Sequence, residues 1–266
     1  MNNRDSTELA WSPGRLAAVP MLADLAPFAA ALPADRWPVC AELNTAFAAR
    51  AGVRFVPPTD DGLDYEARVA ARSEVATREG NWHDLFNALM WAAFPRAKRA
   101  LSRRHAAGRG QEARAGTRGA ARDAATVLDE SGVIFACANP ALATLLRGFQ
   151  WQELFVAQRA AVLREVRCLL FGHALAEKAL TPYVGMTGHA VILDMPAAVL
   201  ASAPAALGIA LDECLAAWLA DPVVLASPRD LQPLPVLGVP GWWPANADPA
   251  FYDNPEYFRP GRRRDL

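Results

Sequence analysis

Apolar and polar positions alternate along this chain with a period that predicts helices more often than strands. The clearest case is residues 81–94, where one helical stripe consists of Trp82, Leu85, Phe86, Leu89 and Ala93. Met90, Trp91 and Phe94 add apolar bulk on another side, and a helix that is apolar nearly all round is buried. We expect this helix to begin at Asn81, a favourable N-cap residue, and to stop before Pro95.

Other segments carry weaker versions of the same signals. Helices are predicted over 39–51, 64–79, 140–146, 151–180 and 211–219, with Gly172 as a kink point in the long one. Strands are predicted at 53–56 and 190–193, together with a hairpin whose strands, 125–128 and 133–136, flank a turn at 129–132. Residues 1–35 are expected to be irregular with short helical pieces.

Two segments depart from regular patterning. Residues 106–121 are rich in Gly, Ala and Arg, and we expect a flexible, solvated loop there. Residues 232–266 are rich in Pro and aromatic residues, which predicts an irregular tail packed on the domain. The expected fold is α+β: a mainly helical single domain over residues 1–266, with a small β-hairpin or sheet and a long irregular C-terminal tail.

Composition narrows the class of protein. Of the 266 residues, 53% are hydrophobic and 21% charged, which excludes a globally disordered chain. A formal net charge of -1 excludes a global field that attracts nucleic acid or an acidic membrane. The four cysteines form no CxxC or CxH spacing, so a thiolate zinc site and a disulfide scaffold are not expected. Prolines interrupt the apolar stretches 16–34 and 195–211, and with no signal-peptide pattern we expect a cytoplasmic protein without a membrane partner.

The predicted buried helix contains a polar group. His83 and Asn87 are four residues apart and share a helix face, and Asp84 lies beside them. The functional interpretation is a metal ligand, or a general base with the group that orients it. A polar network that only fixes the core is the more common explanation of such a group in isolation.

A second polar pair lies in the segment Gly172-His173-Ala174-Leu175-Ala176-Glu177. His173 and Glu177 are again four apart, so both side chains can reach one point, and mixed imidazole and carboxylate ligands suit zinc, iron or manganese. A hydrogen bond on a helix surface is the alternative. His173 continues the apolar face of its helix, which favours a buried role.

Together these residues predict a metal site that activates water. We expect His83, His173 and Glu177 as metal ligands and Asp84 and Asp123 as catalytic carboxylates, with Asn87, His105 and Arg122 as additional candidates. The set is chemically similar to that of the histidine–aspartate hydrolases, although no histidine precedes His83. Neither a GxGxxG nor a GxxxxGK[ST] motif is present, so no nucleotide cofactor is expected.

The leading hypothesis is therefore a metal-dependent hydrolase of a small-molecule substrate, with a phosphoester as the candidate substrate class. A second hypothesis is nucleic-acid or polyanion binding through the arginines of residues 96–122, which we favour less because no aromatic residue interleaves them. A third is a non-catalytic protein that binds a partner through Trp242-Trp243 and has only a structural polar network.

Several motifs resemble a bacterial family known as domain of unknown function 3025. The residues that carry the resemblance are 81–89, 93–95, 122–126 with 129–130, 171–178, and 235–244, which ends in Trp242-Trp243-Pro244. They span most of the chain, so the resemblance implies that the polar segments and the tail belong to one domain. It implies no activity.

Overall fold

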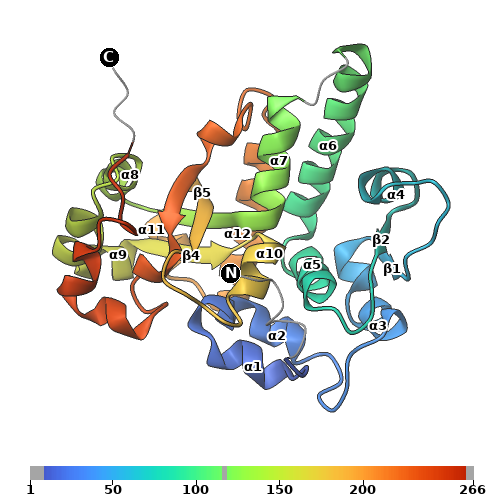
Figure 1. Cartoon of the computed structure of the whole chain (residues 1–266), viewed down its shortest axis with the longest axis horizontal. Coiled ribbons are helices and arrows are strands. Elements are labelled where there is room, and N and C mark those ends of the chain that lie inside the picture. Colours follow the sequence, from blue (N-terminus) through green and yellow to red (C-terminus); the bar gives the residue numbers. More distant parts are fainter. Residues whose placement is uncertain (1–8, 116–118, 262–266) are drawn as a thin grey trace.

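The larger of the two sheets is four-stranded and mixed, in the order β4-β3-β5-β6, and lies left of centre in Figure 1. The computed structural model describes residues 9–115 and 119–261. Strand β3 is buried along its whole length, pairs antiparallel with β4 and parallel with β5, and β6 pairs antiparallel with β5. A separate two-stranded parallel sheet joins β1 and β2. The strands are β1 (Arg54–Val56), β2 (Glu74–Ala76), β3 (Gly132–Cys137), β4 (Val166–Leu170), β5 (Thr187–Asp194) and β6 (Gln232–Pro235).

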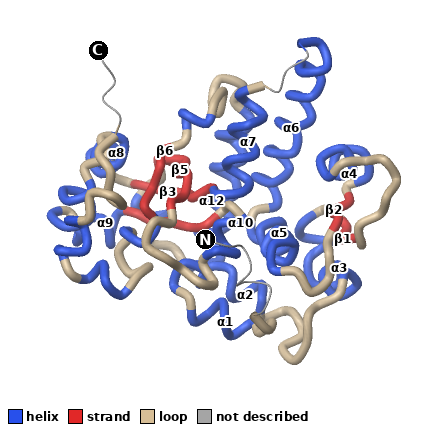
Figure 2. Tube along the Cα trace, viewed as in Figure 1, coloured by secondary structure: helices blue, strands red, loops and turns tan. Residues whose placement is uncertain are grey.

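Helices make up most of the described chain and surround both sheets (Figure 2). The α-helices are α1 (Pro13–Ala18), α2 (Ala26–Ala29), α3 (Cys40–Ala51), α4 (Tyr65–Arg72), α5 (Trp82–Ala93), α6 (Pro95–Ala115), α7 (Ala120–Ser131), α8 (Pro140–Arg147), α9 (Arg159–Glu165), α10 (His173–Lys178), α11 (Ala197–Leu200) and α12 (Pro204–Ala220). Shorter turns are η1 (Pro20–Leu25), the π-helical η2 (Glu153–Ala157), η3 (Pro228–Asp230), η4 (Val236–Gly238), η5 (Pro244–Ala247) and η6 (Pro249–Asp253). The prediction of a mainly helical α+β domain is confirmed.

Helix α5 is the buried helix that the sequence predicts. The Asn81 side chain caps it by accepting a hydrogen bond from the Asp84 amide at 3.1 Å. Ten of its twelve residues are buried, and His83 and Asp84 are the two that remain partly exposed. The next helix, α6, begins at Pro95, and the buried Asp212 carboxylate of α12 accepts from the Arg96 and Ala97 amides. A carboxylate at this position satisfies free amides of the first turn, so α12 fixes the direction of α6.

The predicted hairpin at 125–136 is wrong in its first half. Residues 120–131 form helix α7, which buries Ala124, Ala125 and Leu128 on one face. The apolar run 125–128 is too short to distinguish a period of two from a period of 3.6. Gly132 ends the helix and starts β3, whose partners are β4 and β5 rather than a neighbouring hairpin strand.

The predicted long helix over 151–180 is also wrong. The segment divides into η2, α9, strand β4 and helix α10. Val166 to Leu170 pair with β3, with Leu169 opposite Ile134. A β-branched and apolar run suits either element, and here the strand pairing overrides the helical pattern.

Smaller corrections concern the ends of elements. The helix predicted over 64–79 stops at Arg72, because Ser73 adopts a left-handed conformation with φ of 54°, and β2 follows. The loop predicted over 106–121 is helical as far as Ala115 and again from Ala120, while 116–118 lie outside the described residues. The predicted tail contains the regular strand β6, and its last five residues, 262–266, are also not described.

The predictions for 39–51, 53–56, 140–146, 190–193 and 211–219 match α3, β1, α8, β5 and α12. The short helical pieces expected in residues 1–35 are α1, η1 and α2, and residues 1–8 are not described. Aromatic residues of the tail, Tyr252, Tyr257 and Phe258, are buried against the domain. None of the described helices combines the length and the apolar character needed to cross a bilayer.

Gly172 allows α10 to approach the junction of α7 and β3 closely. A Cβ atom at this position would lie 2.3 Å from the Gly132 nitrogen and 2.5 Å from the Ser131 nitrogen, both backbone atoms that cannot move aside. The Gly172 amide also donates to the Gly132 carbonyl at 2.9 Å. Only glycine therefore fits immediately before His173.

We predict that Gly172→Ala lowers the free energy of unfolding by about 1–3 kcal/mol or more, because the added methyl group overpacks a backbone contact. Gly208→Ala is the matched control, since a Cβ there meets nothing within 4 Å and the position lies inside α12. It should raise stability by up to about 1 kcal/mol. Urea unfolding of both variants measures the difference, and equal stabilities would contradict the close approach at Gly172.

Candidate functional site

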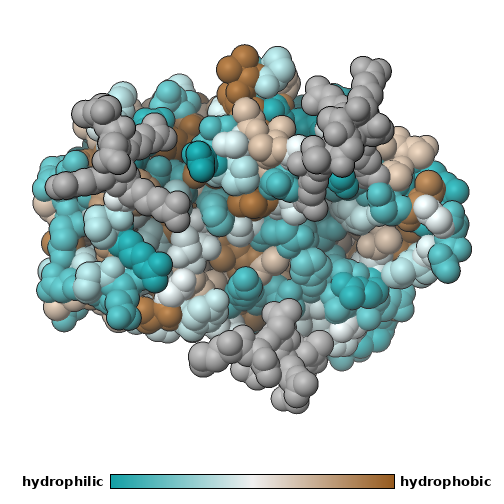
Figure 3. All heavy atoms as spheres, turned by 45° about the horizontal axis from the view of Figure 1, so that its top comes forward, coloured by the Kyte–Doolittle hydropathy of each residue, from teal (hydrophilic) through white to brown (hydrophobic). Residues whose placement is uncertain are grey.

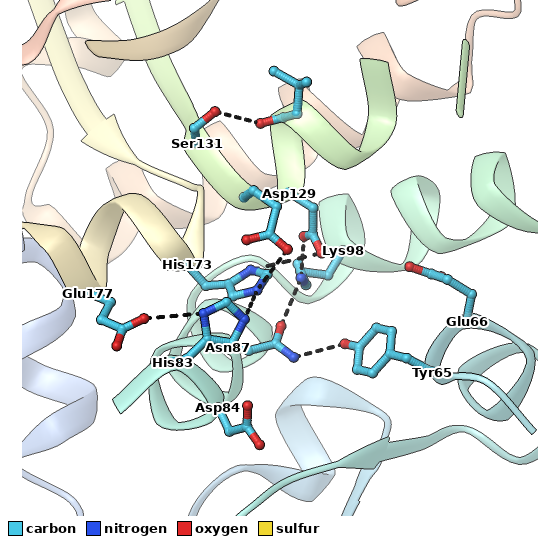
Figure 4. Close-up of polar contacts among 12 residues, drawn as sticks. Tyr65, Glu66, His83, Asp84, Asn87, Lys98, Asp129, Ser131, His173 and Glu177 are labelled. Atoms are coloured by element: carbon cyan, nitrogen blue, oxygen red, sulfur yellow. Dashed lines mark hydrogen bonds and ion pairs between the residues drawn. The ribbon is translucent and has the colours of Figure 1, made fainter. Parts of the chain in front are cut away.

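Helices α5 and α10 bring His83 and His173 into contact. Their Nε2 atoms are 3.1 Å apart, and the rings meet edge to face with centroids separated by 4.4 Å. His83 occupies the first turn of α5, and His173 is the first residue of α10, directly after Gly172. The two polar pairs that the sequence places ninety residues apart along the chain therefore meet in one place (Figure 4).

A carboxylate from α7 completes this cluster. Glu130 lies in the last turn of α7, and its Oε1 is 3.7 Å from His173 Nε2. One donor atom from each of His83, Glu130 and His173 lies within 4.8 Å of the other two. Three helices thus supply a group of two imidazoles and one carboxylate, which is a plausible ligand set for a divalent ion.

Each imidazole has a second carboxylate on the side of its other nitrogen. Glu177 Oε2 lies 3.3 Å from His83 Nδ1, and Asp129 Oδ2 lies 3.9 Å from His173 Nδ1. The Glu177 contact favours the His83 tautomer that carries its proton on Nδ1, which leaves the Nε2 lone pair free to bind a ligand. Glu177 therefore contacts the nitrogen that faces away from His173. The distance from Asp129 to His173 Nδ1 is too long for a hydrogen bond.

A buried network holds Asp129 in place. The Lys98 ammonium, 3% exposed, contacts Asp129 Oδ1 and donates to Asn87 Oδ1 at 3.0 Å. Asn87 Nδ2 in turn donates to the Tyr65 hydroxyl at 2.9 Å. Figure 4 shows this chain of contacts running from the two histidines past Asn87 to Tyr65. It connects α4, α5, α6 and α7 through polar groups alone.

The pKa values of the two histidines are shifted in opposite directions. Contact with Glu177 raises the pKa of His83 above its usual value although burial opposes the charge. Burial lowers the pKa of His173 to about 4, against the attraction of Asp129, so His173 is neutral near pH 7. Burial also works against ionised Asp129, but Lys98 and His173 outweigh it and hold the pKa of Asp129 below its usual range. Burial raises the pKa of Glu130.

The cluster faces a cavity of about 380 Å³. Its wall is polar and is formed by Asp64, Tyr65, Glu66, Ala76, Arg78, His83, Asp84, Asn87, His105, Arg122, Thr126, Asp129, Glu130 and His173. This volume lies at the lower end of the range for small-molecule sites, about 300–1,000 Å³. Small-molecule sites are usually lined mainly by apolar residues, so a wall formed largely by polar and charged residues is unusual.

The two predicted catalytic carboxylates lie in different places. Asp84 lines the cavity, but three contacts of 2.7–2.9 Å tie it to the Arg78 amide and guanidinium. Burial opposes the charge on Asp84, and these bonds outweigh it and lower the pKa of the carboxyl. Asp123 lies in the first turn of α7 and does not belong to the described wall of the cavity. The α7 carboxylate that lies beside the histidines is Glu130, about two turns further along the helix than Asp123.

The additional candidates all line the cavity. Asn87 belongs to the buried network, and His105 is buried with its Nε2 3.7 Å from Glu66 Oε1. Arg122 comes from the first turn of α7. These three positions extend the site from the histidines toward the far wall.

Sequence reasoning missed Asp129, Glu130, Lys98 and Tyr65. Asp129 and Glu130 were assigned to a hairpin turn, where acidic residues are common, so their chemistry was attributed to local structure. Lys98 is one of two lysines in a chain whose other basic residues are arginines, with Lys178 as the second. This rarity beside a predicted buried helix was the signal that could have identified it.

Several arginines of residues 96–122 have partners within the protein. Arg104 donates to the carbonyls of Leu219, Asp221 and Val224 beyond the end of α12. Arg96 pairs with Glu213, and Arg99 donates to Pro95. These side chains bind groups of α12, of the segment after it, or of α6 itself. They therefore do not form one free basic surface.

Lys98→Met is expected to lower the free energy of unfolding by about 3–5 kcal/mol, because it leaves the Asp129 carboxylate buried without its cation. The double variant Lys98→Met/Asp129→Leu should recover most of this loss, since it removes both charges. Chemical denaturation of the two variants and the parent measures both effects. A double variant as unstable as Lys98→Met alone would show that packing, rather than the uncompensated charge, causes the loss.

Comparison with known proteins gives one match. A family model described as protein of unknown function (DUF3025) matches residues 53–262, which include every residue of the cluster and of its network. No curated protein and no solved structure matches the chain. Because the matched segment covers most of the sequence, this chain belongs to the DUF3025 family.

Proposed function

We propose that this protein is a metal-dependent hydrolase that acts on phosphoesters, with a zinc, iron or manganese ion held by His83, Glu130 and His173. The convergence of the two Nε2 atoms at 3.1 Å is the observation that carries the proposal. When two imidazoles bind the same ion, each at about 2.1 Å, their ligating nitrogens lie roughly 3–3.5 Å apart. The side chains therefore already have the separation that a shared ion requires.

The carboxylates behind the histidines support the same proposal. Ligating histidines almost always donate their second N–H to a carboxylate, a carbonyl or a water. His83 has Glu177 in this position at 3.3 Å, whereas the Asp129 carboxylate lies 3.9 Å from His173 Nδ1, near enough for electrostatic attraction but too far for a hydrogen bond. From the sequence, Glu177 was expected to be a metal ligand. In the proposed site Glu177 instead orients His83, and Glu130 is the carboxylate that binds the ion.

The number of protein ligands supports hydrolysis as the reaction. Three protein ligands leave a coordination position for water, and a bound ion lowers the pKa of that water to about 7. The protein's own contribution is to hold the imidazoles through Glu177 and Asp129, and to shape the polar cavity. Arg78 and Arg122 line that cavity, and guanidinium groups recognise phosphate oxygens.

The alternative functions have less support. Binding of nucleic acid would need the arginines of α6 free on one surface, whereas Arg96 and Arg104 bind α12 and the segment after it. For a partner-binding protein, Trp242 and Trp243 would have to be well exposed, and both are partly buried. On the face drawn in Figure 3, hydrophobic side chains form small separate groups rather than one broad patch.

We predict that the purified protein binds one divalent ion per chain and that His83→Ala, His173→Ala and Glu130→Gln each abolish or strongly weaken binding. His189→Ala is the control, because His189 contacts Ser131 instead of the cluster. Metal analysis after dialysis, with circular dichroism to check the fold, gives the result. The metal-loaded parent should hydrolyse bis-p-nitrophenyl phosphate or p-nitrophenyl phosphate, and the three cluster variants should not.

A parent protein that binds no metal would overturn the proposal. Unfolding of the cluster variants, without metal in the parent, would instead assign the histidines to a structural polar network. Bound metal without any phosphoesterase activity would retain the ion site and reject the reaction.

Metal affinity is expected to fall as the pH decreases, because protons compete for the imidazoles. Glu177 raises the pKa of His83, so in the parent this competition begins above the ordinary histidine value of about 6.5. Glu177→Gln removes the carboxylate, and the competition should then begin at a lower pH. The same variant should bind metal about 10- to 100-fold more weakly at a pH where His83 is neutral.

Competition with a chromogenic zinc chelator over a pH series measures both effects. Asp123→Asn is the matched control, since Asp123 lies on α7 outside the cavity wall. A Glu177→Gln profile that superimposes on that of the parent would contradict the orienting role of Glu177.

A further inference from the structure

Tyr65 accepts two hydrogen bonds through its hydroxyl oxygen. Asn87 Nδ2 donates to it at 2.9 Å and Trp91 Nε1 at 3.2 Å. The indole N–H of Trp91 can act only as a donor. Both acceptor positions of the hydroxyl are therefore occupied by groups of the buried helix α5.

The orientation of the Asn87 amide follows from Lys98. An ammonium has donors and no acceptor, so the Asn87 atom that lies 3.0 Å from Lys98 Nζ must be the carbonyl oxygen. The Nδ2 group must then face Tyr65 and donate to it. Lys98 thus fixes the direction of the hydrogen bonds as far as the tyrosine hydroxyl.

The hydroxyl hydrogen of Tyr65 consequently remains to be donated. Within the described part of the chain no carbonyl or carboxylate accepts it, and the other two contacts of the oxygen are the ones it accepts. Tyr65 lines the same cavity as His83, Glu130 and His173. Because the oxygen already accepts two bonds and Tyr65 lines the cavity, its hydroxyl hydrogen is available to a ligand bound there.

We propose that Tyr65 is a substrate-binding donor, and that it binds a non-bridging phosphoryl oxygen of a small phosphoester in this cavity. The inference rests on the proposed function and adds the group that recognises the substrate. Two donors of α5 already face the phenol oxygen, so the hydroxyl can only donate to a ligand. The ligand atom that it contacts must therefore be an acceptor, such as an oxygen. A phosphoryl group suits the setting because Arg78 and Arg122 line the same wall.

The protonation state agrees with this role. Burial raises the pKa of Tyr65, with the nearby Lys98 acting in the opposite direction. The phenol therefore keeps its proton at neutral pH and acts as a donor. It is already oriented before a ligand arrives, so little reorganisation opposes binding.

The test is titration of the full chain with inorganic phosphate by calorimetry, with and without saturating zinc. Tyr65→Phe should weaken phosphate binding about tenfold or more, the usual loss when a hydrogen bond to a charged group is removed. The zinc stoichiometry should stay unchanged, because Tyr65 is not one of the groups that hold the ion.

Trp91→Phe is the matched control. It breaks the same Trp91–Tyr65 hydrogen bond as Tyr65→Phe but leaves the hydroxyl in place. Phosphate affinity should remain within about twofold of the parent in this variant, because the Tyr65 hydroxyl and its hydrogen are retained. Equal loss of phosphate binding in the two variants would assign Tyr65 a structural role only.

Two further outcomes separate this inference from the proposed function. If the parent binds no zinc but binds phosphate through Tyr65, the metal-dependent reaction fails and the donor role stands. If the parent binds zinc but Tyr65→Phe binds phosphate as tightly as the parent, the donor role fails and the ion site stands. A parent that binds no phosphate under either condition overturns the inference.

Discussion

The buried contact between Lys98 and Asp129 constrains every other part of the candidate site. The Lys98 ammonium is 3% exposed and the Asp129 carboxylate is also buried, so both are costly to remove from water. They remain charged only because each is the other's partner. Lys98 comes from the first turn of α6 and Asp129 from the last turn of α7. Their contact therefore fixes the point at which these two antiparallel helices meet α5, and that point is where His173 and Asn87 lie.

The surrounding fold determines that Lys98 reaches this position. The chain leaves the apolar helix α5 at Phe94, and Pro95 begins α6 almost at once. Asp212 then caps α6 from α12, which sets its direction within the first turn. On the opposite side, Gly172 brings the start of α10 against the α7–β3 junction. The site thus depends on two backbone contacts that contain none of its own chemistry.

The sequence was sufficient to predict the buried helix, because helical periodicity, an N-cap and a terminating proline all agree there. It also predicted that His83 and His173 belong to one site, and their Nε2 atoms lie 3.1 Å apart in the structure. It could not show that residues 125–128 are helical, since a run of four residues, three of them apolar, satisfies either period. That one error placed Asp129 and Glu130 in a turn and removed them from the site. Tertiary pairing of β3 with β4, which only the fold contains, likewise divides the segment predicted as one long helix.

The asymmetry between the two histidines argues for a site built to receive a cation rather than for a core that only needs its polar groups satisfied. His173 is kept neutral by burial, with Asp129 at its Nδ1, whereas His83 is drawn toward the charged form by Glu177. Two Nε2 atoms at 3.1 Å can share one proton, and a cation of higher charge could replace that proton between them. Glu130, whose pKa burial raises, is the third group that such a cation would stabilise in its ionised form. Glu130 also attracts a charged His83, so its position beside both imidazoles at the wall of the cavity supports the proposed ion site, in which it would be the third ligand.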